Sequence, residues 1–244
     1  WRCYMEPLSH CSVADIERTE KIHPLADAQT NQDARVVVVD EDVALPSYRV
    51  LAPTQVSSRG LLWWYAQLQA YVFRPTQRIR DAATLAARDM GLTQPYLGAH
   101  VRRGHKWVET AAAPLSGYMS AAQRVQQAMS SVGNTPLVAL AVSEDGESVS
   151  TLQRMGLDGQ GLRTVATHNP RPGYRISIPL AIRMELLNVT EENEVSLINL
   201  LLLSRSSGFV GTFSSGFSKR AVELMTSHLD VEPIYLSLDR PWEP

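Results

Sequence analysis

Two patterns of apolar residues, one typical of strands and one typical of helices, alternate along the second half of the chain. Short apolar runs rich in valine, leucine and isoleucine predict buried strands, and segments with apolar residues every three or four positions predict helices. The predicted strands cover residues 96–101, 137–142, 163–167, 209–212 and 234–238. The predicted helices cover residues 116–132, 147–155, 182–187, 195–204 and 215–228, with an acidic stretch separating the third from the fourth. This alternation predicts an α/β fold with a doubly wound parallel sheet.

The first part of the chain has fewer regular segments. Residues 34–39 (ARVVVV) predict a strand, because consecutive valines suit a buried position in a sheet. Residues 57–72 and 76–90 predict two helices. The apolar residues at helical spacing are predicted to form the inward face of each helix. They are Leu61, Trp64, Leu68 and Tyr71 in the first helix and Ile79, Ala83, Leu85, Ala86 and Met90 in the second. We therefore expect two parts, an amino-terminal α/β part over residues 1–94 and a Rossmann-like domain over residues 95–244.

Composition and charge narrow the function classes. A chain of 244 residues that is 44% hydrophobic can bury one large core or two smaller ones. The formal net charge of -2 gives no reason to expect nucleic acid or an anionic membrane as a partner. The longest apolar run, residues 197–203, is too short to span a bilayer. The chain begins with Trp1 instead of Met, which indicates a fragment or a processed chain, so the lack of a signal peptide is uninformative.

Two local features favour a secretory compartment. Cys3 and Cys11 are either bridged in a small loop or free thiols, and two cysteines match no four-ligand zinc pattern. Asn188, Val189 and Thr190 form a glycosylation sequon, a motif that also occurs by chance.

A cluster of cationic side chains follows the predicted strand 96–101. It contains Arg102, Arg103, His105 and Lys106, and Glu109 follows within reach of the same cleft. In open α/β sheets ligands bind outside the carboxyl ends of the strands. Arginine binds phosphate in a bidentate manner, so the cluster predicts an anion site, with phosphate as the first choice. The alternative is a solvated basic turn.

Two further strand ends are expected to open on the same edge of the sheet. Glu144 and Asp145 follow one of them and could accept hydrogen bonds from a ribose or a base, or simply form the acidic first turn of a helix. The other is followed by residues 211–216 (GTFSSG), where a helix begins. Backbone N–H groups, the helix dipole and the hydroxyls of Ser214 and Ser215 can bind a diphosphate there without a metal, although serine is also an ordinary helix cap.

Other catalytic motifs are weak or missing. Asp40 and Asp42 follow the predicted strand 34–39, as in metal-dependent glycosyltransferases that hold a cation and a sugar diphosphate; the alternative is a solvated acidic strand end. The chain has no Walker motif and no GxGxxG, which argues against nucleoside triphosphate hydrolysis and nicotinamide binding. It has no GxSxG elbow.

Three blocks together resemble a known family. They are HVRRGHKWVETAAAPLSGYM (100–119), LAVSED (140–145) and LLSRSSGFVGTFSSGFSKRAVELM (202–225). They are similar in order and spacing to the conserved core of α1,6-fucosyltransferases and their bacterial nodulation-type relatives. QLQAYVFRP (67–75) parallels a further pattern of that family, so the likeness extends from Ser57 to Leu238.

The resemblance implies a GT-B-like fold with two Rossmann-like halves, of which the amino-terminal one is shortened here and lies on the acceptor side. It implies an inverting, metal-independent transfer of fucose from GDP-fucose to a glycan or glycoprotein acceptor, without a cofactor, in the secretory pathway and most simply the Golgi lumen. By the same resemblance Arg102 and Arg103 hold the donor diphosphate, Lys106 assists catalysis and Glu109 is the base. The remaining donor-binding residues implied by the blocks are Tyr118, Glu144, Asp145, Asn199, Thr212, Ser214 and Ser215.

The chain departs from the family pattern at three places. His105 stands where the family has Asp, Asn199 replaces an Asp in the helix before TFSS, and Glu109 matches after a one-residue gap. His105 and Asn199 leave open a non-catalytic relative that binds glycans or nucleotides. Asp40 and Asp42 leave open a metal-dependent nucleotide-sugar transferase.

Overall fold

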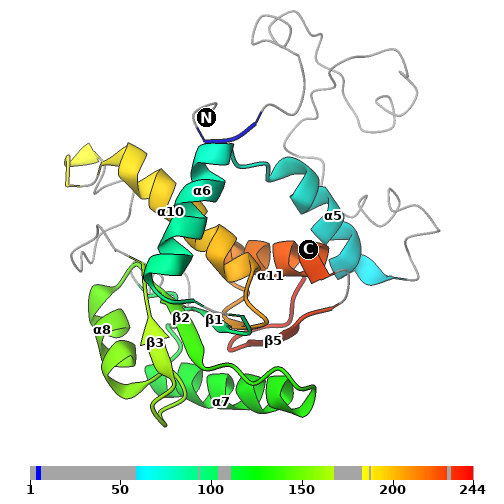
Figure 1. Cartoon of the computed structure of the whole chain (residues 1–244), viewed down its shortest axis with the longest axis vertical. Coiled ribbons are helices and arrows are strands. Elements are labelled where there is room, and N and C mark those ends of the chain that lie inside the picture. The colour runs from blue at the N-terminus through cyan, green and yellow to red at the C-terminus, as the bar shows by residue number, and fades with distance from the viewer. Residues whose placement is uncertain are drawn as a thin grey trace, which may run out of the picture. The chain divides into compact units, whose positions relative to one another are not determined.

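The computed structural model describes residues 4–6, 59–92, 94–103, 111–167, 183–186, 188–229 and 232–243. The chain divides into two compact units, one made of Trp1–Glu6 with Leu61–Pro244 and the other of Pro7–Gly60. The strands and helices discussed below (Figure 1) lie in the first unit, apart from Gly60, the first residue of α5. The predicted strand 34–39 lies outside the described residues, so the proposed amino-terminal α/β part stays a prediction.

Five parallel strands form the central sheet, in the order β3-β2-β1-β4-β5. They are β1 (Leu97–His100), β2 (Val138–Val142), β3 (Arg163–Val165), β4 (Gly208–Gly211) and β5 (Ile234–Ser237). The chain runs outward from β1 to β3, crosses back to β4 beside β1, and ends at β5. This order confirms the doubly wound parallel sheet, with its topological switch point between β1 and β4.

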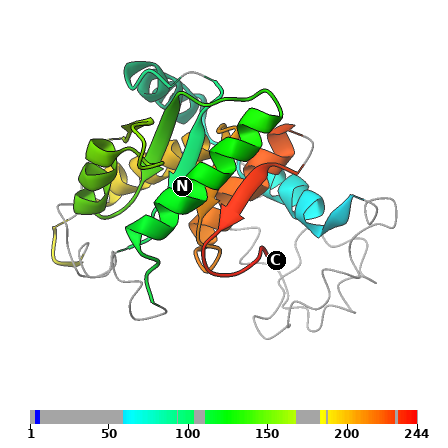
Figure 2. The same ribbon diagram turned by 90° about the horizontal axis from the view of Figure 1, so that it is seen from below.

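Helices cover both faces of the sheet. On one face lie α7 (Leu115–Ser131) and α8 (Gly146–Met155), and on the other lie α6 (Gln77–Asp89), α10 (Val189–Ser204) and α11 (Gly216–Leu229) (Figures 1 and 2). The core is divided in the same way. Leu97, Ala99 and Val101 pack with the α7 side, while Leu140 and Phe209 pack with the α10 and α11 side. The central strands are therefore buried on both faces, as their uninterrupted apolar sequences indicated.

One predicted break in the helical pattern is wrong. The acidic stretch between residues 187 and 195 is the first part of α10, which runs without interruption from Val189 to Ser204. Asn188 caps this helix, because its side chain accepts hydrogen bonds from the backbone N–H groups of Thr190 and Glu191 at 2.9 and 3.4 Å. Acidic side chains in the first turn are favoured by the helix dipole, so they mark a helix start and not a separator.

The predicted inward faces of the two early helices are partly wrong. In α5 (Gly60–Val72) Ala66 is buried, but Leu68 and Tyr71 are 42% and 63% exposed. In α6 Ile79 and Ala83 are buried, whereas Leu85 is 49% exposed. Leu85 follows Ala83 by two positions, which places it on the opposite side of a helix with about 3.6 residues per turn. The inward face of α6 is therefore narrower than expected.

Two glycines let helices approach β4 closely. A Cβ atom on Gly208 would lie 2.5 Å from Met129 Sδ of α7, and one on Gly211 would lie 2.8 Å from Ser218 Oγ of α11. Both distances are shorter than van der Waals contact. Glycine at these strand positions thus sets how close the helices on the two faces can come to the sheet.

Candidate functional site

A cavity of about 280 Å³ lies at the carboxyl ends of the central strands. Because β2, β1 and β4 are adjacent and parallel, the residues that follow them meet at one edge of the sheet. The prediction that three strand ends open together is therefore confirmed. Four of the predicted site residues line the cavity, namely Arg102, Glu144, Asn199 and Ser215.

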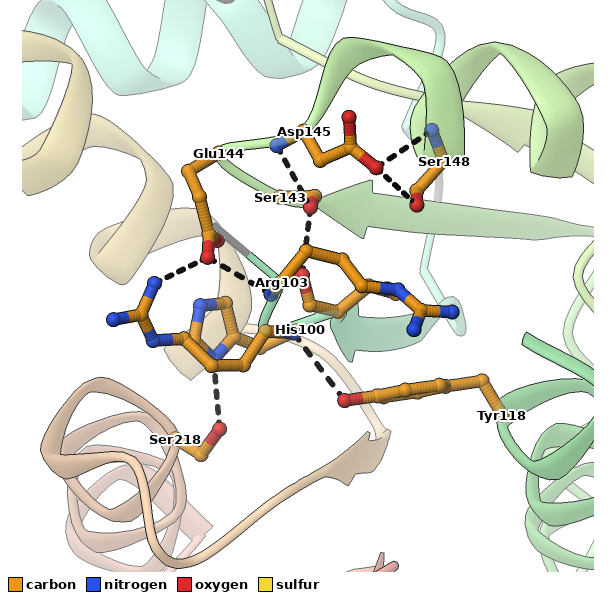
Figure 3. A network of polar contacts seen from close by, with 10 residues as sticks. His100, Arg103, Tyr118, Ser143, Glu144, Asp145, Ser148 and Ser218 are labelled. Carbon is orange, nitrogen blue, oxygen red and sulfur yellow. Dashed lines mark hydrogen bonds and ion pairs between the residues drawn. The ribbon is translucent and has the colours of Figure 1, made fainter. Parts of the chain in front are cut away.

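Arg102 and Glu144 form an ion pair in the lining of the cavity. The guanidinium Nη1 contacts Glu144 Oε1, and the two side chains are 23% and 9% exposed. The same carboxylate oxygen accepts the backbone N–H of Arg103 at 2.8 Å (Figure 3). A guanidinium carries five N–H donors, so Arg102 can hold Glu144 and still offer donors to an anion. Glu144, expected to accept from a ribose or a base, orients the arginine in this structure.

Asp145 serves as the cap of α8. Its carboxylate accepts the backbone N–H groups of Glu147 and Ser148 at 3.3 and 3.2 Å, and the Ser148 hydroxyl (Figure 3). Ser143 supports this turn, since its hydroxyl donates to the Val101 carbonyl at 2.6 Å and accepts the Asp145 N–H at 3.1 Å. The arrangement corresponds to the alternative reading of an acidic first turn, and Asp145 does not line the cavity.

Tyr118 lies behind the cavity, in the core between α7 and the sheet. It is fully buried, and its hydroxyl accepts the backbone N–H of Arg102 at 3.2 Å (Figure 3). Burial raises the pKa of Tyr118, and the nearby Thr212 hydroxyl and the hydrogen bond from the Arg102 N–H oppose the rise without cancelling it. Tyr118 therefore acts on Arg102 through the backbone and does not face the cavity.

Arg103 also lies away from the cavity. Its side chain extends away from Glu144 in Figure 3, and its Nε atom is buried without a hydrogen-bond partner among the described residues. Of the two consecutive arginines, Arg102 lines the cavity and Arg103 does not. The predicted diphosphate contact of Arg103 has no support from its position in this structure.

The turn between β4 and α11 is attached to the end of β5. The Asp239 carboxylate accepts the backbone N–H of Phe213 at 2.8 Å, the N–H of Ser214 at 3.2 Å and the Ser214 hydroxyl. Burial raises the pKa of Asp239, but hydrogen bonds from Ser214, Arg240, Ser237 and Phe213 outweigh that effect and lower the pKa below its usual value.

These contacts correct one expectation about the turn. Free backbone N–H groups in residues 211–216 were predicted to bind a diphosphate, but those of Phe213 and Ser214 donate to Asp239. Ser215 lines the cavity at the start of α11, whereas Thr212 and Ser214 do not. Any anion bound at this end of the cavity would meet Ser215 and the following turn of α11. Asp239 was missed, because nothing near it in the sequence marks it as a partner of residues 213–214.

One wall of the cavity is a face of α10. Glu192, Val195, Ser196 and Asn199 lie on it at helical spacing, and Thr167 from the segment after β3 joins them. The Thr167 hydroxyl donates to Asn199 Oδ1 at 2.5 Å. Glu192, Ser196 and Thr167 were not predicted. The spacing of residues 192, 196 and 199 could have identified the first two, had 188–194 been recognised as helix.

His100 also lines the cavity. Its Nδ1 atom lies 2.7 Å from Ser218 Oγ, and its ring lies against Phe217 with centroids 4.9 Å apart. The histidine is buried at the last position of β1, so its orientation is fixed by α11. It was not predicted as a site residue, although it opens the first block of the family resemblance.

The remaining predicted residues lie outside the part of the chain that the structure describes. They are His105, Lys106, Glu109, Asp40 and Asp42. Within the described ranges no three histidine, cysteine or acidic side chains gather as a metal site would require. The helices found in those ranges are too short or too polar to cross a membrane.

Comparison with known proteins identifies the family. The family model for alpha-(1,6)-fucosyltransferase N- and catalytic domains matches residues 1–153. An alpha-(1,6)-fucosyltransferase of Drosophila melanogaster is 27% identical over 217 residues, covering 83% of this chain and 33% of that protein. The chain thus spans about a third of the length of this curated relative.

Solved structures show weaker similarity. POFUT1 in complex with GDP-fucose has a TM-score of 0.47 at 14% identity, covering 83% of this chain and 54% of that one. The fucosyltransferase NodZ from Bradyrhizobium has a TM-score of 0.40 at 13% identity, covering 62% and 43%. The family model, which matches more than half of the chain, is decisive: this chain belongs to the family of alpha-(1,6)-fucosyltransferase N- and catalytic domains.

Proposed function

We propose that this chain belongs to an inverting glycosyltransferase that transfers fucose from GDP-fucose to a glycan or glycoprotein without a metal ion. Two lines of argument support the proposal. The family to which the chain belongs consists of fucosyltransferase domains. The cavity at the strand ends contains the guanidinium of Arg102, which is paired with Glu144 and can still offer N–H donors to a diphosphate.

The observation that carries the proposal is the grouping of Arg102 and Ser215 in one cavity. Arg102 comes from the end of β1 and Ser215 from the start of α11, on the two sides of the topological switch point. A guanidinium and a helix amino terminus are two common ligands of phosphate oxygens. The diphosphate of the donor would therefore lie between β1 and α11, and its nucleoside would extend toward α10.

In the proposed reaction the acceptor hydroxyl attacks the anomeric carbon of fucose from the face opposite the diphosphate. The new C–O bond forms while the bond to the diphosphate breaks, and its electron pair leaves with GDP. Glu109 accepts the proton of the attacking hydroxyl. Arg102, with Lys106, stabilises the negative charge on the leaving diphosphate. The roles of Glu109 and Lys106 rest on the resemblance of the first block, since both lie outside the described residues.

Isothermal titration with GDP, GDP-fucose and UDP, each with manganese and with EDTA, tests the proposal. We expect GDP and GDP-fucose to bind equally well in both conditions and UDP to bind weakly. Failure to bind any guanine nucleotide would exclude the proposed donor. EDTA-sensitive binding of UDP would favour the metal-dependent transferase with Asp40 and Asp42. GDP-fucose binding without turnover on any glycan acceptor would favour the non-catalytic relative.

We also infer that the protein works in the lumen of the secretory pathway. Asn188 of the sequon is exposed at the start of α10, where a glycan can be attached. Peptide N-glycosidase should lower the apparent mass of protein secreted from animal cells, and Asn188→Gln should abolish that shift. Absence of the shift in the wild-type chain would remove this support for a lumenal location.

A further inference from the structure

Ser218 is fully buried on α11, and among the described residues its hydroxyl has one hydrogen-bond partner, the His100 ring. The two side chains point toward each other in Figure 3, and Ser218 Oγ lies 2.7 Å from His100 Nδ1. Other buried hydroxyls of α10 and α11 donate to a carbonyl of their own helix, as those of Ser204 and Thr226 do at 2.9 and 2.8 Å. The Ser218 hydroxyl is instead directed out of its helix toward the end of β1.

The surroundings of Ser218 determine the direction of this hydrogen bond. If His100 Nδ1 carried a proton, the Ser218 oxygen would accept it, and the serine's own proton would have no acceptor among the described residues. A buried donor without an acceptor is unfavourable, so the hydroxyl donates and Nδ1 accepts. In the neutral imidazole the ring proton then lies on Nε2. The same reasoning disfavours the imidazolium, in which both nitrogens carry protons.

The proton on Nε2 matters because His100 lines the cavity, together with Arg102. Since Nδ1 is engaged by α11, Nε2 is the nitrogen with which the ring can contact a ligand. Whatever group meets Nε2 meets an N–H donor. Phosphate, hydroxyl and carbonyl oxygens of a nucleotide-sugar can accept from it, whereas the opposite tautomer would turn a lone pair toward these acceptors.

The neighbour of Ser218 in the sequence also fixes the ring. Phe217 packs against His100 with the ring centroids 4.9 Å apart and the planes at 44°, and Phe217 lines the cavity as well. Packing alone does not distinguish the two orientations of the imidazole that differ by a half-turn. That half-turn would put a carbon atom in the place of Nδ1, and a carbon atom cannot accept the Ser218 proton. Ser218 therefore selects one orientation of the ring.

We propose that Ser218 is a positioning residue that holds His100 as the Nε2–H tautomer, so that His100 acts on the ligand of the cavity as a hydrogen-bond donor. Ser218 itself is not among the residues that line the cavity. The inference rests on the proposed function for the identity of the ligand, a GDP-sugar. The position of the ring proton is a property of the free protein.

Nitrogen NMR of the free protein, labelled with ¹⁵N-histidine, tests the position of the proton. Nuclear Overhauser contacts with the Phe217 ring identify the His100 signals. Nδ1 should show the shift of an unprotonated, hydrogen-bonded nitrogen, and Nε2 that of a protonated one. In Ser218→Ala the Nδ1 signal should move toward the value of a nitrogen without a hydrogen bond. A proton on Nδ1 of the wild-type protein would overturn the inference, and so would an unchanged spectrum in folded Ser218→Ala.

Titration with GDP tests the consequence for the ligand. Ser218→Ala should weaken GDP binding by about 3- to 10-fold, the value of one hydrogen bond between neutral groups, because the ring loses its fixed orientation. Ser218→Cys keeps a weak S–H donor and should recover part of the loss. Ser204→Ala is the matched control, since this serine is also buried but donates to the Leu201 carbonyl of its own helix. It should leave the His100 signals and the GDP affinity unchanged.

A double-mutant cycle shows whether Ser218 acts through the histidine. Once His100 is replaced in His100→Gln, adding Ser218→Ala should have no further effect on GDP affinity. An equal loss in both backgrounds would overturn the inference and leave the proposed function intact. If the wild-type protein binds no GDP, the proposed function fails, and the NMR measurement on the free protein still decides where the ring proton lies.

Discussion

The Arg102 guanidinium is held by the Glu144 carboxylate, which lies two residues after the end of the neighbouring strand β2. Glu144 also accepts the backbone N–H of Arg103, so a single side chain fixes both the charge and the backbone that carries it. An arginine held in place loses less conformational entropy on binding an anion than a free one. For the diphosphate proposed above, the pair would therefore hold the Arg102 guanidinium in place before the ligand binds.

Arg102→Lys should weaken GDP binding by about 30-fold or more, corresponding to the loss of a fork-shaped contact of about 2 kcal/mol. Lysine keeps a positive charge beside Glu144, so the melting temperature of the free protein should change little. Titration with GDP and thermal unfolding measure the two effects. Wild-type affinity in this variant would refute the assignment of Arg102 to the donor.

Tyr118→Phe should destabilise the fold by about 1 to 3 kcal/mol, because it leaves the backbone N–H of Arg102 without an acceptor in a buried place. Urea unfolding measures the change. Tyr235→Phe is the control, since that hydroxyl donates to Glu232 at the surface and its loss should cost less than about 0.5 kcal/mol. Equal effects of the two substitutions would contradict a positioning role for Tyr118.

Ser214→Ala should cost about 1 kcal/mol of stability, because the serine hydroxyl donates to Asp239. GDP affinity should be retained, since Ser214 does not line the cavity. Titration and urea unfolding on the same preparation compare the two. Complete loss of GDP binding with an intact fold would show that the hydroxyl itself is a ligand.

Asp239→Asn should destabilise the protein at neutral pH by about 1 kcal/mol, an estimate kept small because the side chain is exposed. The pKa of Asp239 is lowered in the fold, so its carboxylate contributes stability above its unfolded pKa of about 3.9. That contribution is lost as the pH falls through the lower folded pKa. Unfolding of both proteins between pH 7 and pH 2 should therefore give curves that converge in acid. If the difference in unfolding free energy between the two proteins stayed constant down to pH 2, the ionised Asp239 carboxylate would not be the source of the stability.

Glu109→Gln should keep GDP affinity while the rate of fucose transfer falls by about 10² to 10⁴, the usual contribution of a general base. Titration measures the first quantity, and release of GDP in the presence of a glycan acceptor measures the second. Near-normal turnover would exclude Glu109 as the base. Loss of GDP binding together with turnover would instead indicate a role in holding the donor.

The sequence predicted the parts of this site that depend on local pattern. Apolar runs identified β1, β2 and β4, and parallel pairing then brought Arg102, Glu144 and Ser215 to one edge. Asp239 could not be found in this way. It reaches the turn at Phe213 because β5 pairs with β4 in a register that sets Ser237 opposite Gly211, and register is a tertiary property.

Glu192 was overlooked for a different reason. Its surroundings in the sequence, two consecutive acids within a polar stretch, are typical of solvent-exposed helix starts. Burial against the cavity depends on how α10 packs on the sheet, which its nearly uniform apolar second half does not reveal. The opposite error occurs in α5, where Leu68 and Tyr71 were predicted to be buried and are exposed. Helical spacing of apolar residues does not by itself establish that other elements cover that face of the helix.

Because Gly211 has no side chain, α11 can pack close to β4, and this close packing affects a side chain that lines the cavity. A Cβ atom there would lie 2.7 Å from Phe209 Cε1 and 2.8 Å from Ser218 Oγ, and Ser218 is the partner of His100, which lines the cavity. A single methyl group at residue 211 would therefore displace a side chain in the site without touching any ligand. Inherited or engineered losses of activity in this family can thus originate at positions that no map of ligand contacts would include.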